Sequence, residues 1–249
     1  MAAMDSLTVA RSLRGSIGML AMAWLLDEST MRRGAELGLN AEGMGGYAVG
    51  RLGVLGDCPV DNVVGAAYFW EPATMTAMVE AGRAAMSPAE GAAVYTQICQ
   101  EWGAEKLAGM EGVERLGEIL EKVVASASPL GAPLFAGWRD MPRPDDPGPA
   151  LTFHLAQVMR ELRFSRHAVA IQAAGIGPLE AILSGPAGEW NAKMFGWPGP
   201  YPDVADLVEA REAAEVATDQ MHAADLDVLT DDERADLRDL AKAARAHQG

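Results

Sequence analysis

Residues 151–167 read LTFHLAQVMRELRFSRH, and the spacing of their apolar side chains decides the fold class. At about 100° per residue these side chains fall on one stripe of a helix. The residues of the stripe are Leu151, Leu155, Val158, Met159 and Leu162. A stripe of this kind is typical of a helix that packs against a protein core. We therefore expect a helix from about residue 150 to 162 and another that begins near His167.

Helical spacing of apolar residues continues through the rest of the chain, whereas the alternation typical of strands is hard to find. Aromatic residues, which favour strands, are few: six Trp, four Tyr and five Phe among 249 residues. Helix-start signals add to this pattern. Ser87-Pro88-Ala89-Glu90 and Thr230-Asp231-Asp232-Glu233 are capping boxes, and Pro72 suits a first helical turn. The sequence predicts an all-α, multi-helix globular fold.

Two stretches rich in proline and glycine interrupt the helical pattern, at residues 128–150 and 185–202. Near the N-terminus we expect one long helix from about residue 15 to 36, and after residue 203 we expect two helices. The predicted organisation is a helical core with a ligand pocket, residues 1–184, followed by an acidic helical segment, residues 185–249.

The charge of the chain restricts its partners. Asp and Glu number 35 against 20 Lys and Arg, which gives a formal net charge of −15. Nucleic acids and anionic membranes both require clustered basic residues, so these partners are disfavoured. Residues 203–249 hold 13 acidic and 5 basic residues, a net charge of −8. A solvated helical hairpin is the expected explanation, and contact with a basic partner or a second copy in a homodimer is the alternative.

The N-terminal apolar run Ile17–Leu26 follows two arginines, as the apolar region of a signal peptide does. It is too short to span a bilayer, and two acidic residues follow it at once, so we interpret it as a buried helix. Cys58 and Cys99 are expected to be ordinary thiols. These features favour a cytoplasmic protein.

Motifs that bind cofactors or carry nucleophiles are missing: the sequence has no P-loop, no HExxH and no GxSxG. We therefore expect no cofactor. Only four histidines occur, and two of them, His154 and His167, enclose a charged segment. His154 and Glu161 are seven residues apart and share one edge of the apolar stripe, and Arg163 lies near the other edge.

This segment contains the groups that acid–base catalysis needs. We predict His154 or His167 as general acid or base, with Glu161 orienting it. Arg160 or Arg163 would hold an anionic group of the substrate. Structural ion pairing is the alternative explanation. A metal site made of both histidines and Glu161 lacks a fourth ligand in the sequence.

A second cluster combines aromatic rings with polar groups. Tyr47 and Arg51 lie one helical turn apart, and Tyr68 and Trp70 end the next predicted helix. Aromatic side chains with polar tips are common in ligand pockets, and equally common in cores. We predict that they line a substrate pocket between residues 42–70 and 150–183, with Trp138 of the proline-rich stretch as a lid.

Several stretches together resemble an actinobacterial all-α family described as helix-turn-helix or MarR-like. They are GYAVGRLGVLG at 46–56, AAYFWEP at 66–72, PLFAG at 133–137, DDP at 145–147 and the segment from His154 to Ala170. The resemblance covers most of residues 40–183 and implies a closing winged-helix-like segment. In this chain that segment looks degenerate, because the recognition helix and wing are reduced to residues 185–202.

Two functions are compatible with these features. The first is a small-molecule-binding enzyme without a cofactor, an isomerase, cyclase, lyase or hydrolase of actinobacterial specialised metabolism that uses histidine as acid or base. The second, which the resemblance implies, is a ligand-responsive MarR-like transcriptional regulator. The second needs a basic recognition helix, and residues 188–201 contain a single base, Lys193. The charge of the chain therefore favours the first.

Overall fold

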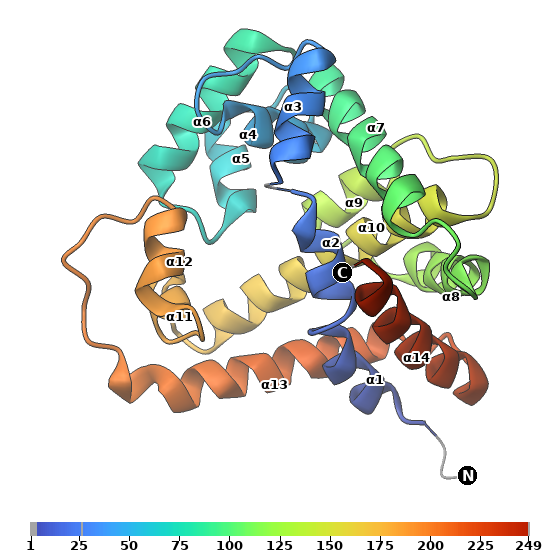
Figure 1. Cartoon of the computed structure of the whole chain (residues 1–249). Coiled ribbons are helices and arrows are strands. Elements are labelled where there is room, and N and C mark those ends of the chain that lie inside the picture. Colours follow the sequence, from blue (N-terminus) through green and yellow to red (C-terminus); the bar gives the residue numbers. More distant parts are fainter. Residues whose placement is uncertain (1–3, 26, 249) are drawn as a thin grey trace.

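The computed structural model describes residues 4–25 and 27–248, and every regular element in these ranges is a helix (Figure 1). The predicted all-α, multi-helix fold is confirmed. The first helices are α1 (Ser6–Leu13), α2 (Ile17–Ala23), α3 (Glu28–Glu36), α4 (Gly45–Leu52), α5 (Val60–Ala67), α6 (Pro72–Ala85) and α7 (Pro88–Lys106). They are followed by α8 (Val113–Ser126), α9 (Pro133–Arg139), α10 (Pro149–Ala173), α11 (Pro178–Leu183), α12 (Gly188–Met194), α13 (Val208–Asp225) and α14 (Asp231–Gln248). Short 3-10 helices span Gly53–Leu55 and Ala205–Leu207.

Helix α10 is the central element of the fold. It contacts α2, α7, α8, α9 and α13, and residues 152–159 are buried on every side of the helix. The expectation of two helices, over 150–162 and from His167, is wrong because α10 continues from Pro149 to Ala173. No glycine or proline follows Pro149 within that span, so nothing in the local sequence ends the helix.

One face of the N-terminal apolar run is buried, but Met19 and Met22 on its other face are exposed, and the run does not belong to one long helix. Ile17, Leu20 and Trp24 lie in the core, and α2 ends at Ala23. Asp27 then caps α3 by accepting a hydrogen bond from the backbone N–H of Ser29 at 2.8 Å. Residue 26, the last of the predicted run, lies outside the described residues. Within the described ranges, no helix is long and apolar enough to cross a membrane.

The predicted helix starts are confirmed where the sequence signal is a cap. Ser87 and Glu90 exchange both hydrogen bonds of a capping box at the start of α7. Thr230 and Glu233 do the same before α14, with distances of 3.0 and 3.3 Å. Helix α6 begins at Pro72. These agreements follow from caps being local interactions that need no tertiary partner.

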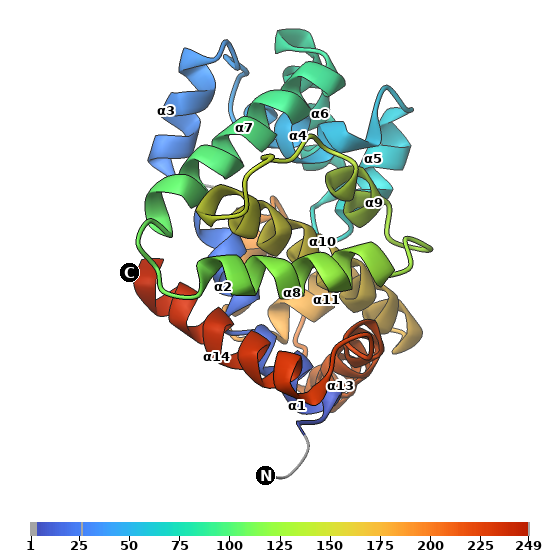
Figure 2. The ribbon, with the colours of Figure 1, turned by 90° about the vertical axis from the view of Figure 1, so that its right-hand side faces the viewer.

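The acidic C-terminal helices are packed against the rest of the molecule. Helix α13 lies along α10 and α1, and α14 lies along α8, as Figures 1 and 2 show from two directions. Leu226, Leu229 and Leu237 join the same hydrophobic core as the N-terminal helices. The expectation of a solvated hairpin is therefore incomplete, because Glu215, Asp219 and Asp225 form ion pairs with partly buried arginines outside the hairpin. The division at residue 184 stays a prediction.

Candidate functional site

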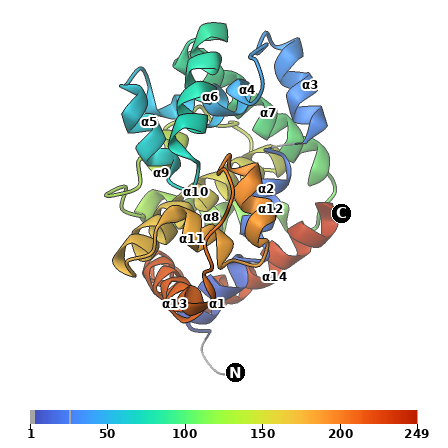
Figure 3. The same ribbon diagram turned by 90° about the vertical axis from the view of Figure 1, so that its left-hand side faces the viewer.

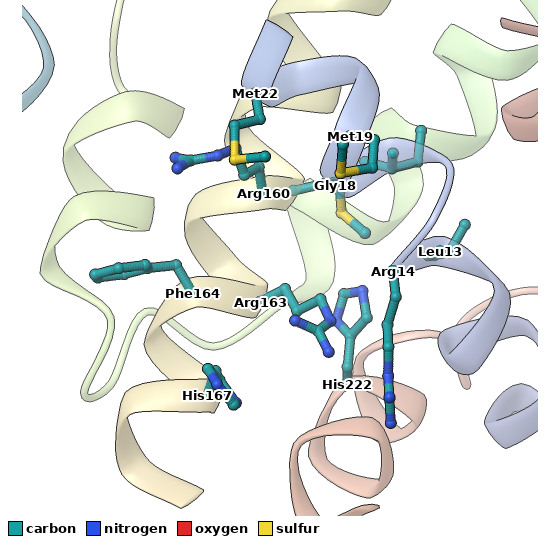
Figure 4. A pocket seen from close by; sticks show the side chains of 12 residues that line it. Leu13, Arg14, Gly18, Met19, Met22, Arg160, Arg163, Phe164, His167 and His222 are labelled. Carbon is teal, nitrogen blue, oxygen red and sulfur yellow. The ribbon is translucent and has the colours of Figure 1, made fainter. Parts of the chain in front are cut away.

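Three side chains on successive turns of α10, Arg160, Phe164 and His167, form a wall shared by two pockets. The first, here called the methionine pocket, has a volume of about 220 Å³ and lies between α10, α1, α2 and α13 (Figure 4). Its other lining residues are Leu13, Arg14, Ile17, Gly18, Met19, Met22, Met159, Arg163 and His222. In Figure 4 the methionines of α2 lie above the guanidinium of Arg163, with His222 and Arg14 beside it.

The second pocket, here called the aromatic pocket, lies on the other side of the shared wall and has a volume of about 200 Å³. Helices α4, α5, α11 and α12 enclose it, and Figure 3 shows the last two beside α10. Its other lining residues are Tyr47, Arg51, Ala67, Phe69, Trp70, Ala181, Ile182, Gly185, Pro186, Asn191, Phe195 and Arg211. This is the place predicted for a substrate pocket, between residues 42–70 and 150–183.

A buried ion network holds the shared wall in place. The Glu161 carboxylate accepts two hydrogen bonds from Arg51, at 2.9 and 2.8 Å, and one from Arg160 at 2.8 Å. Gln157 donates a fourth at 2.8 Å, and Arg51 also donates to the Tyr47 hydroxyl at 2.8 Å. One carboxylate therefore faces two guanidinium groups, and the network carries one excess positive charge.

The excess charge belongs to Arg160. Burial alone raises the pKa of Glu161, but Arg51 and Arg160 hold that pKa below its ordinary value. Burial lowers the pKa of Arg51, yet Glu161 and Tyr47 outweigh it and raise that pKa. The pKa of Arg160 is lowered, because the effect of burial is larger than the opposing attraction of the Glu161 carboxylate. Arg51 and Glu161 thus form a matched bidentate pair, and Arg160 is the cation whose charge is least compensated.

A second ion cluster connects α13 to the methionine pocket. Asp219 accepts hydrogen bonds from Arg14 at 3.1 and 2.5 Å. Glu215 accepts a hydrogen bond from Arg163 at 2.9 Å and forms an ion pair with Arg211 at 2.7 Å. The two pockets are lined by five arginines, and among the described residues no acidic side chain lines either one. The carboxylates lie behind the arginines rather than in the pockets.

His167 is oriented by Thr218 of α13. The Thr218 hydroxyl donates to the carbonyl of Ala214 at 2.7 Å, so it accepts from His167 Nδ1–H at 2.9 Å. This tautomer leaves Nε2 with a free lone pair, 3.7 Å from a Glu215 oxygen. Burial lowers the pKa of His167 to about 4, although Glu215 opposes the shift. The imidazole is therefore neutral at pH 7 and can accept a proton.

The structure brings together only part of the predicted site. Tyr47, Arg51, Trp70, Arg160 and His167 line the aromatic pocket, and Glu161 lies directly behind it. Arg163 lines the methionine pocket. Within the described residues, the hydrogen-bond partners of the Glu161 carboxylate are Arg51, Arg160 and Gln157. It therefore does not orient an imidazole within this part of the chain. Its catalytic role stays a prediction.

Three predicted residues lie elsewhere. His154 is fully buried beside Trp138, with ring centroids 6.2 Å apart, and its Nδ1 lies 3.4 Å from Gln100 Nε2. The expectation that Trp138 forms a lid is wrong, because its indole is buried in α9 and donates to the Arg51 carbonyl at 3.1 Å. Tyr68 packs edge-to-face on Phe69 and is outside the lining of both pockets.

Sequence reasoning missed Arg14, Arg211 and His222, which α1 and α13 bring to the pockets. Arg211 and His222 form ordinary ion pairs within α13, with Glu215 and Asp225, and only the tertiary packing shows that they line a pocket. The partner of Arg14, Asp219, lies 205 residues away. The metal alternative gains no support: across the described ranges, no group of three His, Cys, Asp or Glu side chains is arranged to hold a metal ion. Both cysteines are free thiols, as expected.

The sequence model of a helix-turn-helix family matches residues 10–248, nearly the whole chain. No curated protein and no solved structure matches.

Proposed function

The chain belongs to this helix-turn-helix family, and we propose that it binds a small acidic molecule with an apolar body at the wall shared by the two pockets. The observation that supports the proposal is the lining itself. Five arginines and no acidic side chain face the two pockets within the described residues, in a chain whose net charge is −15. An anionic ligand is the partner that such a lining favours.

Arg160 is the proposed anchor for the anionic group. It lines both pockets, and its charge is incompletely compensated because it shares the Glu161 carboxylate with Arg51, which binds both oxygens. A ligand carboxylate or phosphate would supply the missing negative charge. A hydrogen bond to a charged group contributes about 1.5–3 kcal/mol, which corresponds to roughly 10- to 100-fold in affinity.

Most of the other side chains that line the two pockets are apolar. Phe69, Trp70 and Phe195 enclose one end of the aromatic pocket, and Met19 and Met22 border the methionine pocket. Aromatic rings suit a planar ligand body, and methionine side chains adapt to irregular shapes. Volumes near 200 Å³ suit a ligand of about the size of a substituted bicyclic acid.

His167 gives this site a route to catalysis. His167, whose neutral imidazole has a lone pair on Nε2, lines both pockets beside the proposed anchor Arg160. A ligand held by its acidic group would present a neighbouring C–H or O–H to this lone pair, and the imidazole would act as general base. Isomerisation, elimination and cyclisation can begin with this proton abstraction, and hydrolysis can begin when the same base takes a proton from an attacking water molecule. If this is correct, His167→Gln removes turnover of an acid found by screening but changes its affinity little; turnover retained by that variant would refute the catalytic role.

Membership of the family favours a second candidate, a ligand-responsive regulator that binds DNA. Helices α11 and α12 follow each other in the chain and are in contact, so they are the pair that this candidate would use. However, α12 carries one base, Lys193, which lies 3.5 Å from Glu189, and its Asn191 lines the aromatic pocket. This helix therefore offers little positive charge to a phosphate backbone. A gel shift with the protein's own promoter at low salt tests this candidate, and absence of a shift at micromolar protein would exclude it.

Matched ligands test the proposed binding site. We expect 1-naphthoate to bind at least tenfold more tightly than its neutral amide, 1-naphthamide, in isothermal titration calorimetry. Arg160→Met should abolish this difference, and Arg160→Lys should retain part of it. Arg32→Met, which removes an exposed arginine of α3, is the control. Equal affinities for acid and amide in the wild type, or an unchanged preference in Arg160→Met, would refute the proposal.

A further inference from the structure

A third pocket, of about 210 Å³, lies between α3, α4 and α7. We call it the neutral pocket because, among the described residues, its lining contains no charged side chain. Its walls include Thr30 and Met31 of α3, Asn40 and Met44 of the following loop, and Gly46 and Tyr47 of α4. It shares none of the five arginines described above.

We propose that the neutral pocket is a second binding site, for a small uncharged molecule that is mostly apolar and carries one polar group. A charged ligand is disfavoured because burying a charge without a partner is costly. An apolar cavity of about 150 Å³ is large enough to bind benzene, so about 210 Å³ accommodates a somewhat larger molecule.

Two side chains of the neutral pocket could bind the single polar group of the ligand. The Thr30 residue is 2% exposed, and its hydroxyl has no hydrogen-bond partner within the described structure. A buried hydroxyl without a partner costs free energy, which a ligand group that donates to it or accepts from it would recover. Asn40 is exposed at the same pocket and adds an amide that both donates and accepts.

Tyr47 connects this pocket to the site proposed above. It lines both the neutral and the aromatic pocket, and its hydroxyl accepts a hydrogen bond from Arg51 at 2.8 Å. Arg51 in turn binds Glu161, the carboxylate that Arg160 shares. A molecule that displaces the Tyr47 ring therefore disturbs the buried ion network that holds Arg160. The coupling rests on the proposed anion site, whereas the existence of the neutral site does not.

Methyl NMR on the whole protein, with ε-13C-methionine labelling, tests the location. The probe is indole, an uncharged bicyclic molecule with one N–H. We expect indole to shift the methyl signals of Met31 and Met44, which line the neutral pocket, and to leave Met19 and Met22 unchanged. We expect 1-naphthoate to do the reverse. Absence of any shift with millimolar indole, or shifts confined to Met19 and Met22, would overturn the proposal.

Substitution of Gly46 provides a second measurement. A Cβ there would lie 3.6 Å from Leu39, an ordinary contact, so Gly46→Ala should fold and Gly46→Leu should fill the pocket. Indole affinity should fall at least tenfold in Gly46→Leu and remain unchanged in Gly65→Leu, a control at an open position of α5. If Gly46→Leu fails to fold, Gly46→Ala must still weaken indole binding. Unchanged indole affinity in a folded Gly46 variant would refute the neutral site.

Coupling between the sites is measured separately. Saturating indole should change the dissociation constant of 1-naphthoate, and thermodynamic reciprocity requires the same factor in the opposite experiment. Tyr47→Leu should abolish that factor. A neutral site that binds indole without any coupling would refute only the connection through Tyr47. Failure of 1-naphthoate to bind, with indole still shifting Met31 and Met44, would refute the anion site and leave the neutral site standing.

Discussion

Glu161→Gln is the substitution that most directly tests the buried ion network. Glu161 is fully buried and accepts four hydrogen bonds, two from Arg51 and one each from Arg160 and Gln157. The amide has nearly the same shape but no charge. It therefore leaves the buried guanidinium of Arg51 and the partly buried guanidinium of Arg160 without a counter-ion, and one of the acceptor oxygens becomes a donor.

Removing one partner from a buried ion pair costs about 3–5 kcal/mol. For a domain of this length, each 1 kcal/mol shifts the melting temperature by about 2–4 °C, so Tm should fall by about 6–20 °C. Urea unfolding at pH 7, followed by circular dichroism, measures the free energy directly. The control is Glu118→Gln, which removes an exposed carboxylate 3.2 Å from Arg115 and should cost less than about 1 kcal/mol.

Removal of Arg160 should change the effect of Glu161→Gln. Arg160→Met alone should change stability little, because it removes the cation that burial disfavours and leaves the Arg51–Glu161 pair intact. In the Arg160→Met background, Glu161→Gln leaves only the Arg51 guanidinium without a counter-ion. Its cost should be smaller by about 0.5–3 kcal/mol. A loss below about 1 kcal/mol for Glu161→Gln, or the same loss in both backgrounds, would refute the assignment of excess charge to Arg160.

Three further predictions concern stability. Burial lowers the pKa of His154 and of His167 to about 4, so both are neutral in the folded protein and protonate near pH 6.5 when unfolded. The unfolded chain therefore binds more protons below pH 6.5, so the free energy of unfolding falls between pH 6.5 and 4. In urea unfolding at pH 5, His167→Gln should remove about 2 kcal/mol of this decrease. An unchanged dependence of stability on pH in this variant would contradict the lowered pKa of His167. Gly103→Ala would place a Cβ against Phe153 where α7 meets α10, and it should cost about 1–3 kcal/mol, whereas Gly65→Ala at an open position should cost nothing; equal effects would disprove the close contact. Ser87→Ala removes the side-chain cap of α7 and should lower the free energy of unfolding by about 1 kcal/mol, which a stability equal to wild type would rule out.

The helices and their starts were largely predictable because they depend on neighbours in the chain. The two capping boxes and Pro72 begin helices as expected. The predictions failed where packing overrode weak local signals. The chain from residue 15 to 36 divides into α2 and α3, and α10 continues through His167 without a break. Residues 152–159 of α10 are buried all round, which an apolar stripe on one face does not reveal.

The candidate site was predictable only in part, for the same reason. Tyr47, Arg51, Trp70, Arg160 and His167 were chosen for residue type, and the structure gathers them around one pocket. Sequence spacing suggested that Glu161 works with a histidine. In the structure Glu161 instead pairs with Arg51, 110 residues away, and no periodicity within one helix could indicate that partner.

The sequence by itself determined that this chain is all-α and that its densest group of ionisable side chains lies on one helix. Helical period and caps are encoded within a few residues, so they can be read locally. Only the tertiary structure decided what those side chains do. The acidic α13 brings Glu215 and Asp219 against Arg163 and Arg14. Part of the acidic excess behind the net charge of −15 therefore holds the arginines that line a pocket. Whether a charge is compensated depends on neighbours within a few ångströms, and these come from opposite ends of the chain.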